Sequence, residues 1–299
     1  MNGFPRPRVM GILNVTPDSF SDGGKFTDPA VSVERGREMA AEGAELIDIG
    51  GESTRPGAAA VPLQEELRRV IPVIEALSRT VAVPLSIDTS KAAVAAAALH
   101  AGATMVNDVT ALRGDPEMAA VAARAKASVI LMHMRGTPRT MQHRPRYRDV
   151  VADVMRWLRE AAERAEAAGI ARSRIFIDPG IGFGKTVTHN LEILRGLPQL
   201  VDVGYPVVLG ASRKSFIGNM LDAEVDDRLA GSLACAAHAA RCGVAIVRVH
   251  DVKPTVDLLR MIDAINNGTA THDARLMTHD QCQRQHVSRG SCVMGHGSP

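Results

Sequence analysis

The sequence is poor in aromatic residues and has almost no excess of charge of either sign. Only 3% of its 299 residues are aromatic, so it lacks the stacking surfaces on which single-stranded nucleic acids bind. The 35 lysines and arginines nearly balance the 33 aspartates and glutamates, which leaves a net charge of +2. A protein that binds the nucleic-acid backbone needs a clear basic excess. We therefore expect no nucleic-acid partner.

Long hydrophobic runs are also missing. The longest apolar stretches, such as Ala92–Leu99 and Val129–Met132, are far shorter than the roughly 20 residues that span a bilayer. Near the N-terminus, Pro5, Arg6, Pro7 and Arg8 stand where a secretion signal would need its apolar core. We expect no membrane partner and a cytoplasmic location.

Cysteine is scarce, and its spacing indicates no chemistry. Cys235, Cys242, Cys282 and Cys292 form no CxxC pair, so neither a redox motif nor a zinc site is predicted. Cys235 and Cys242 are expected on one helix as small buried hydrophobic residues.

Short apolar runs alternate with segments that have helical spacing. Apolar stripes after Pro62 (Leu63–Ile74) and after Asp149 (Val150–Ala161) predict amphipathic helices. The runs between such segments are continuous, as expected for strands buried on both faces of a parallel sheet. They are Val9–Leu13, Leu46–Ile49, Leu85–Ile87, Met105–Val106, Val129–Met132, Ile175–Ile177, Val207–Leu209 and Ile246–Val249.

Eight such units over about 270 residues are about 34 residues each, which is the size of the repeat in a (β/α)₈ barrel. We predict an α/β fold of this kind, a TIM barrel, for residues 1–270. A doubly wound open sheet is the competing fold, because periodicity does not decide whether the sheet closes.

Two loops and a tail depart from this pattern. The segments Asn14–Pro29 and Gly50–Val61, after the first and second strands, are long and rich in small and polar residues, which favours a functional role. Residues 271–299 lack apolar periodicity and hold His272, His279, His286 and His296. The histidine spacing matches no zinc signature, so we predict a loosely attached C-terminal tail.

A polar side chain closes each predicted strand. One Asp or Asn at such a place commonly caps a helix or forms a turn, but eight at one end of a barrel predict an active site. Carboxylates and amides on the early strands suit a polar organic ring, and cations on the last two suit an anion such as phosphate. The residues are Asn14, Asp48 with Glu52, Asp88, Asn107 with Asp108, His133, Asp178, Arg213 with Lys214, and Arg248 with His250.

The glycine-rich segment Gly180–Lys185 (GIGFGK) is not a phosphate-binding P-loop, because three residues rather than four separate Gly180 from Gly184. We predict a tight turn whose glycines adopt positive φ. Phe183 at its crest is placed to present a ring to a planar ligand.

Taken in order, these motifs resemble the dihydropteroate synthases, folate-pathway enzymes of the pterin-binding barrel family. The resemblance covers about residues 8–268. It is carried by MGILNVTPDSFSDGG (Met10–Gly24), IDIGGESTRPGA (Ile47–Ala58), SIDTSK (Ser86–Lys91), NDV (Asn107–Val109), MHMRGTP (Met132–Pro138), DPGIGFGK (Asp178–Lys185), SRKSF (Ser212–Phe216) and RVHDV (Arg248–Val252).

The resemblance implies that 6-hydroxymethyl-7,8-dihydropterin pyrophosphate and p-aminobenzoate are the small-molecule substrates. The products would be 7,8-dihydropteroate and pyrophosphate, with Mg²⁺ as cofactor. It also implies a homodimer, for which the helical face Leu229–Ala240 is a candidate surface.

The resemblance further implies a role for each matching residue. Catalysis is assigned to Asp88, Lys214, Arg248 and His250, with Asp88 stabilising positive charge on the pterin methylene. Pterin binding is assigned to Asp88, Asn107, Met132, Asp178, Phe183, Lys214 and Arg248. Pyrophosphate binding is assigned to Asn14, Arg55, Arg248 and His250, with Asn14 also the Mg²⁺ ligand. The p-aminobenzoate pocket is assigned to Phe20, Thr54, Arg55, Pro56, Phe183, Ser212 and Lys214.

Three alternatives compete with this interpretation. A corrinoid-dependent methyltransferase domain would keep the pterin carboxylates but lack the pyrophosphate residues and the two loop motifs. A non-catalytic pterin-binding relative would be expected to have lost Asp88, Lys214 or Arg248. An unrelated phosphosugar barrel enzyme would explain the cations but not the carboxylates on the third and sixth strands.

Overall fold

The structure is a computed structural model that describes residues 6–16, 29–53, 57–137 and 140–267. The chain divides into two units, one of Phe4–Leu259 and a second that includes the segment from Arg260 onward. Within the described residues, no helix is both long enough and apolar enough to cross a membrane.

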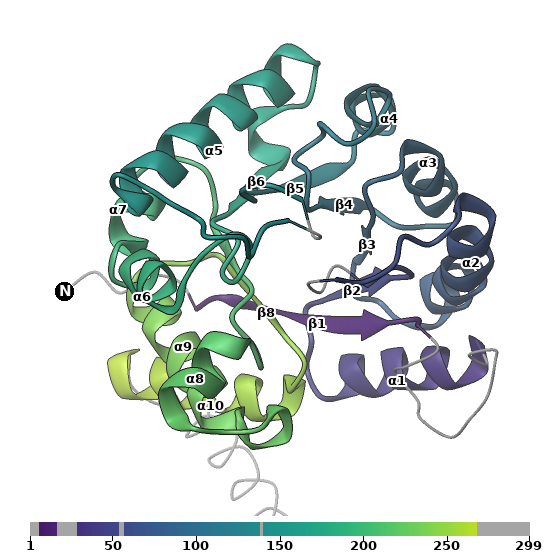
Figure 1. Ribbon diagram of the computed structural model, residues 1–299. Coiled ribbons are helices and arrows are strands. Elements are labelled where there is room, and N and C mark those ends of the chain that lie inside the picture. Colours follow the sequence, from purple (N-terminus) through teal and green to yellow (C-terminus); the bar gives the residue numbers. More distant parts are fainter. Residues whose placement is uncertain (1–5, 17–28, 54–56, 138–139, 268–299) are drawn as a thin grey trace, which may run out of the picture. The chain divides into compact units, whose positions relative to one another are not determined.

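An eight-stranded parallel sheet forms the centre of the Phe4–Leu259 unit (Figure 1). Its strands run in the order β6-β5-β4-β3-β2-β1-β8-β7. The two ends of this order meet, because Ile177 pairs with Val207 and its N–H donates to the Pro206 carbonyl at 3.0 Å. The strands are β1 (Arg8–Asn14), β2 (Leu46–Gly50), β3 (Leu85–Asp88), β4 (Met105–Asp108), β5 (Ser128–Met132), β6 (Ile175–Asp178), β7 (Val208–Leu209) and β8 (Ile246–Val249).

Helices follow the strands along the chain and surround the sheet (Figure 1). α5 begins after Asp149, whose carboxylate accepts hydrogen bonds from the N–H groups of Val151 and Ala152, each at 3.0 Å. The helices are α1 (Pro29–Ala41), α2 (Leu63–Thr80), α3 (Ala92–His100), α4 (Met118–Arg124), α5 (Val150–Ala167), α6 (Val187–Arg195), α7 (Leu197–Val201), α8 (Ser215–Leu221), α9 (Leu229–Arg241) and α10 (Val252–Asn267), with short 3₁₀ turns η2 (Arg172–Arg174) and η3 (Val225–Asp227).

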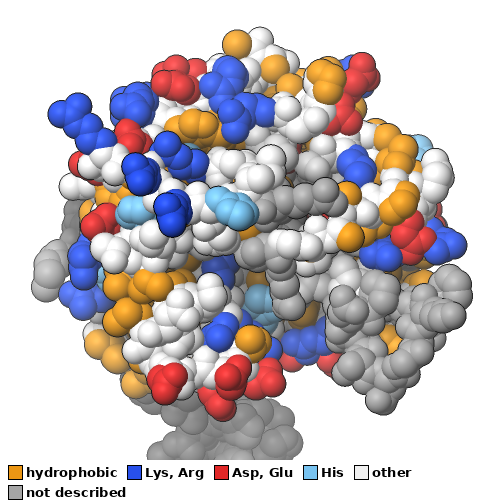
Figure 2. All heavy atoms as spheres, viewed as in Figure 1, with side chains coloured by type: hydrophobic (Ala, Val, Ile, Leu, Met, Phe, Trp, Pro, Cys, Tyr) orange, Lys and Arg blue, Asp and Glu red, His pale blue; other side chains and the backbone are white. Residues whose placement is uncertain are grey.

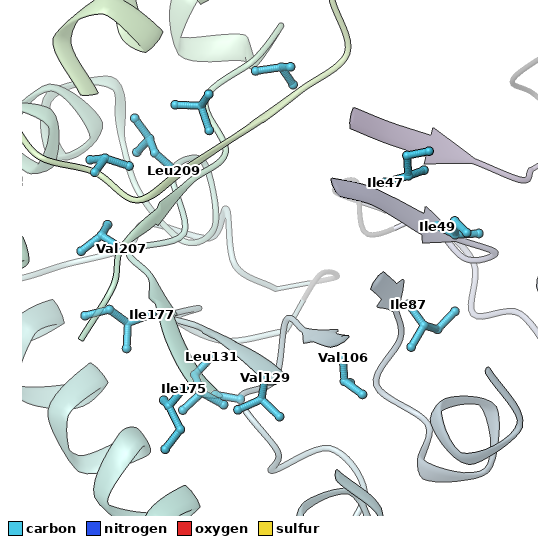
Figure 3. Close-up of a cluster of buried hydrophobic side chains, with 14 of the residues drawn as sticks. Ile47, Ile49, Ile87, Val106, Val129, Leu131, Ile175, Ile177, Val207 and Leu209 are labelled. Carbon is cyan, nitrogen blue, oxygen red and sulfur yellow. The ribbon is translucent and has the colours of Figure 1, made fainter. Parts of the chain in front are cut away.

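The outward side of the strands carries the main apolar core. Figure 3 labels ten of these side chains around the sheet, and all ten belong to one buried cluster that also includes side chains of the surrounding helices. The labelled residues are Ile47, Ile49, Ile87, Val106, Val129, Leu131, Ile175, Ile177, Val207 and Leu209.

The inward side of the strands holds a second, smaller apolar layer. Its members are Met10, Leu46, Met105, Ile130, Phe176, Val208 and Ile246. Since side chains alternate between the faces of a strand, the residue two places further along also points inward. Two positions after Leu46, Met105, Phe176 and Ile246 come Asp48, Asn107, Asp178 and Arg248. The interior is therefore apolar at one level and polar at the next, toward the carboxyl ends of the strands.

The predicted barrel is confirmed, and the open sheet is excluded by the pairing of Ile177 with Val207. The predicted helices at residues 63–74 and 150–161 are also confirmed. The expectation that Cys235 and Cys242 lie on one helix is wrong. Cys235 lies on α9, but α9 ends at Arg241 and Cys242 follows it. The tail at 271–299 lies outside the described residues, and its predicted boundary stays a prediction.

Candidate active site

The polar layer of the barrel interior brings together side chains from strands far apart in the sequence. Asp48 on β2 is completely buried, and Asp88, Asn107 and Asp178 keep at most 9% of their surface exposed. Arg248 on β8 is half-buried beside them. Figure 2 shows basic and histidine side chains in and beside the recess at the middle of this face.

Arg248 connects two of the carboxylates. Its Nε donates to Asp48 Oδ2 at 2.6 Å, and its Nη2 donates to Asp88 Oδ2 at 2.8 Å. Asp48 Oδ2 also accepts from Asn107 Nδ2 at 2.8 Å. Since charged hydrogen bonds of this kind are short and directional, the four side chains form one fixed group.

Asp178 and Lys214 lie on the other side of this group. Asp178 Oδ1 accepts from the N–H of Gly180 at 2.7 Å, so its Oδ2 remains for another partner. Lys214, at the start of α8, donates to the Ile181 carbonyl and lies 4.7 Å from the centre of the Phe183 ring.

Gly210 leaves space between these charges. A Cβ at this position would lie 3.8 Å from Asp178 Oδ2 and 3.9 Å from both Lys214 Nζ and Arg248 Cβ. A side chain larger than alanine would therefore crowd the Asp178 carboxylate and the Lys214 amino group. The arrangement suits a flat molecule that carries both donors and acceptors on its edge.

Burial sets the protonation of this site. Burial, together with the charges of Asp48, Asp108 and Glu66, raises the pKa of Asp88 to about 7, although Arg248 opposes the shift. The pKa of Asp178 is also raised by burial, with Lys214 acting against the rise.

The two cations shift in opposite directions. Burial lowers the pKa of Lys214 to about 8, against the attraction of Asp178. The pKa of Arg248 is raised, because Asp48 and Asp88 outweigh its burial. Near neutral pH the site thus holds groups whose charge changes within a narrow pH range.

The loops after β7 and β8 are tied together beside Lys214. Ser212 Oγ accepts from the N–H of His250 at 3.2 Å and lies 3.0 Å from His250 Nδ1. Arg213 adopts a left-handed backbone conformation with φ of 57°, and its guanidinium makes two hydrogen bonds to Asp251. Arg213 is therefore a structural cation that joins the two loops, whereas the sequence grouped it with the anion-binding residues.

The glycine turn after β6 is confirmed, with φ of 67°, 84° and 65° at Gly180, Gly182 and Gly184. Lys185 is buried beneath it and donates to the carbonyls of Gly180 at 2.9 Å and Phe183 at 3.0 Å. Burial lowers the pKa of Lys185, and its amino group holds the turn that carries Phe183.

His133 also supports this turn. Its Nδ1 lies 3.0 Å from Lys185 Nζ, and its ring meets Trp157 edge-on. Burial and the nearby Lys185 lower the pKa of His133 to about 2, so the ring is neutral. His133 closes a strand as predicted but serves the turn rather than a ligand.

Met132 and Phe183 supply the apolar part of the site. Met132 is buried at the end of β5 in a small cluster with Val109, Met134 and Met141, and the half-buried Phe183 packs against this cluster.

A cavity of about 380 Å³ opens beside Asp88 and is lined in part by Ser53, Thr89 and Thr110. This volume suits a small organic ligand.

Asn14 ends β1 in register with Gly50 and is half-buried. Among the described residues, no group of three or more His, Cys, Asp or Glu side chains is placed to hold a metal ion. A single amide oxygen still fits Mg²⁺, which commonly takes one or two protein ligands and completes its shell with phosphate oxygens and water. The donor set therefore fits a Mg²⁺ that arrives with a pyrophosphate.

Four predicted site residues lie outside the described residues: Phe20, Thr54, Arg55 and Pro56. Asp48 was among the predicted strand-end residues but was assigned no role, although it follows Leu46 by two positions, as Asp178 follows Phe176. Lys185 was missed as a residue of this region. No spacing signal marks Lys185, because its partners are backbone carbonyls of its own turn and the distant His133.

Comparison with known proteins shows the family of this chain. The family model of pterin binding enzymes matches residues 10–250. Dihydropteroate synthase of Escherichia coli is 48% identical over 258 residues, which are 86% of this chain and 91% of the relative. The chain belongs to the family of pterin binding enzymes, as its motifs predicted.

Solved structures resemble it equally well. Dihydropteroate synthase of Xanthomonas albilineans with 4-aminobenzoic acid superposes with a TM-score of 0.83 at 52% identity, covering 88% of this chain and 94% of that one. A structure of the same enzyme with 7,8-dihydropteroate gives a TM-score of 0.80 at 49% identity, with the same shares covered.

Proposed function

We propose that this protein is a dihydropteroate synthase that joins 6-hydroxymethyl-7,8-dihydropterin pyrophosphate to p-aminobenzoate and releases pyrophosphate. One observation carries the proposal beyond family membership. Asp178 Oδ2, Lys214 Nζ and the Cβ of Arg248 lie within 4 Å of the Cβ position at Gly210, and Asp88 accepts a hydrogen bond from Arg248. This arrangement offers acceptors and donors to the edge of a pterin and keeps a cation beside its reactive side chain.

Pterin recognition follows from the donors and acceptors. The pterin edge carries adjacent N–H groups, and a carboxylate that accepts two of them pairs with it in a bidentate manner. Asp178 Oδ1 accepts one hydrogen bond from the N–H of Gly180 and keeps a second lone pair, so both oxygens of Asp178 can accept from the pterin edge. Asn107 and Lys214 make the remaining hydrogen bonds to the pterin edge. Met132 and Phe183 pack against the ring. A competing ring without these N–H groups leaves buried charges unpaired and is rejected.

The reaction breaks the bond between the pterin methylene and the pyrophosphate oxygen and forms a bond from that carbon to the amine nitrogen. As the pyrophosphate leaves with its electron pair, positive charge develops on the methylene and the ring. A preorganised carboxylate beside the ring stabilises this charge, and Asp88 is the group so placed. The amine then attacks and loses a proton, which needs no strong base.

The leaving anion meets Arg248 and His250, and His250 is held by Ser212 from the loop after β7. Ser212 is hydrogen-bonded to His250, and its predicted role in the p-aminobenzoate pocket stays a prediction. Mg²⁺ held by Asn14 would neutralise charge on the leaving pyrophosphate. The residues Phe20, Thr54, Arg55 and Pro56 stay predictions for the p-aminobenzoate pocket, which Phe183 and Lys214 would share.

A homodimer is part of this proposal. Leu221 and Val225, at and after the end of α8, and Leu229 at the start of α9 are exposed apolar residues close together in the sequence. Exposed apolar side chains gathered on one surface are typical of a protein interface. The predicted cytoplasmic location stays a prediction.

A coupled assay tests the proposed activity. The protein is mixed with Mg²⁺, the pterin pyrophosphate and p-aminobenzoate, and pyrophosphate and 7,8-dihydropteroate are measured together. We expect both products in equal amounts. Pyrophosphate release that is independent of p-aminobenzoate, or no product at all, would contradict the proposal.

A further inference from the structure

We propose that Asp48 is a positioning residue of the pterin site: its buried carboxylate turns the amide oxygen of Asn107 toward the ligand and holds the guanidinium of Arg248 against Asp88. This inference rests on the proposed function, since it assigns to Asp48 the donor and acceptor pattern that the pterin meets. Asp48 itself has no exposed surface, so it acts through its neighbours.

The orientation of Asn107 follows from the chemistry of its partner. A carboxylate oxygen only accepts hydrogen bonds, so the amide group 2.8 Å from Asp48 Oδ2 is the nitrogen of Asn107. The carbonyl oxygen then occupies the other branch of the amide, and Asn107 retains 6% exposure. Asp48 thus makes Asn107 an acceptor for a pterin N–H. With a neutral partner in place of Asp48, either orientation of the amide would be satisfied.

The same oxygen of Asp48 fixes Arg248. The guanidinium is planar, and its Nε and Nη2 donate to Asp48 and Asp88 at 2.6 Å and 2.8 Å. With two of its donors bound to carboxylates from β2 and β3, the plane of the guanidinium cannot rotate. Asp48 therefore presets the arginine that meets the pyrophosphate.

Asp48 is also costly to bury, which argues against a purely structural role. Its Oδ1 is buried without a hydrogen-bond partner in the described part of the chain. A buried, unsatisfied polar atom lowers stability and in native proteins needs an explanation. Asp108, at the end of β4, is equally buried. Its two oxygens accept from the N–H groups of Thr110 and Leu112, and it shapes a turn.

Asp48→Asn is the first test, with Ser86→Ala as its matched control. Ser86 is the register partner of Asp48 on β3 and is equally buried, and its hydroxyl lacks a hydrogen-bond partner among the described residues. We expect Asp48→Asn to lower kcat/KM for the pterin substrate by about 10- to 100-fold, as for loss of a charged buried partner. Ser86→Ala should stay within about twofold of wild type. Equal values for wild type and Asp48→Asn would overturn the proposal.

The pH profile separates positioning from a general loss of structure. Asp88 is faced by Arg248 from β8 and by the negative charges of Asp48, Asp108 and Glu66. Removing the charge of Asp48 lowers the pKa of Asp88, so the acidic limb of the kcat/KM profile should move to lower pH. A reduced rate with an unmoved limb would mean that Asp48 serves the fold alone.

The wild-type protein supplies a measurement that does not depend on the variant folding. In ¹⁵N-labelled protein, the side-chain amide protons of Asn107, assigned with Asn107→Ser, should exchange with water more slowly than those of exposed asparagines. Fast exchange would refute the orientation. If the wild-type protein yields no dihydropteroate, the proposed activity fails. The role of Asp48 is then still decided by the amide exchange of Asn107 and by calorimetry of wild type and Asp48→Asn with 6-hydroxymethylpterin.

Discussion

Arg248 and Asp88 are 160 positions apart in the sequence, and a hydrogen bond of 2.8 Å joins Nη2 of the one to Oδ2 of the other. The pair supplies the two charges that the reaction needs. Arg248 is the cation for the leaving pyrophosphate, and Asp88 is the carboxylate for the positive charge that develops on the pterin. Each residue also keeps the other from being an isolated buried charge.

Asp88→Asn should lower kcat by a factor on the order of 10²–10³, beyond any change in KM, because a fixed charge stabilises the transition state more than the neutral ring. Arg248→Ala should instead raise KM for the pterin substrate, since it removes contacts made in both states. Single-turnover rates at saturating pterin pyrophosphate make the comparison. Equal rates for wild type and Asp88→Asn would leave Asp88 only a binding role.

The pH dependence of kcat/KM should be bell-shaped, with a narrow optimum. Asp88 must be ionised, and its pKa of about 7 makes the rate rise with pH on the acidic side. Lys214 must be protonated, and its pKa of about 8 makes the rate fall above that value. Because these groups interact, the two limbs report the cluster as a whole. Lys214→Arg is the diagnostic variant, because arginine stays charged and should remove the basic limb.

Asp178→Asn should weaken pterin binding by about 2–4 kcal/mol while the fold is retained, because an N–H replaces an acceptor opposite a ring N–H. The structure explains the direction of this change. One oxygen of residue 178 must accept from Gly180, so the amide of the variant turns its NH₂ group toward the ligand. Calorimetry with a pterin measures the loss, and unchanged affinity would remove Asp178 from the site.

The strands and the charged strand ends were predictable from the sequence, because continuous apolar runs and the residues that close them are local features. Which strand-end groups face the ligand was not. His133 turns to Lys185 and Arg213 turns to Asp251, and both partners come from distant segments. Asp48 was visible at its strand end, but its role appears only when Arg248 is brought beside it from β8.

Binding of p-aminobenzoate should require pyrophosphate and Mg²⁺. The predicted loops at 14–29 and 50–61 carry residues of the p-aminobenzoate pocket, and we expect bound pyrophosphate to order them. Calorimetry should detect p-aminobenzoate only when both are present, and a metal chelator should abolish the signal. Tight binding to the protein alone would contradict this order of binding.

The glycine turn that carries Phe183 should tolerate no side chain at Gly180. Its φ is 67°, and a Cβ there would lie 2.0 Å from the carbonyl oxygen of His133, which is backbone and cannot move aside cheaply. Gly169→Ala is the matched control, because Gly169 also has a positive φ, of 94°, but its Cβ would meet only Ala123 at 3.9 Å. The control should lose about 1 kcal/mol from the free energy of unfolding, the cost of the left-handed backbone alone. Gly180→Ala should lose about 3 kcal/mol or more, because backbone strain and a steric clash add to each other. Urea unfolding of both variants measures the difference, and equal losses would show that the turn and His133 can separate without cost.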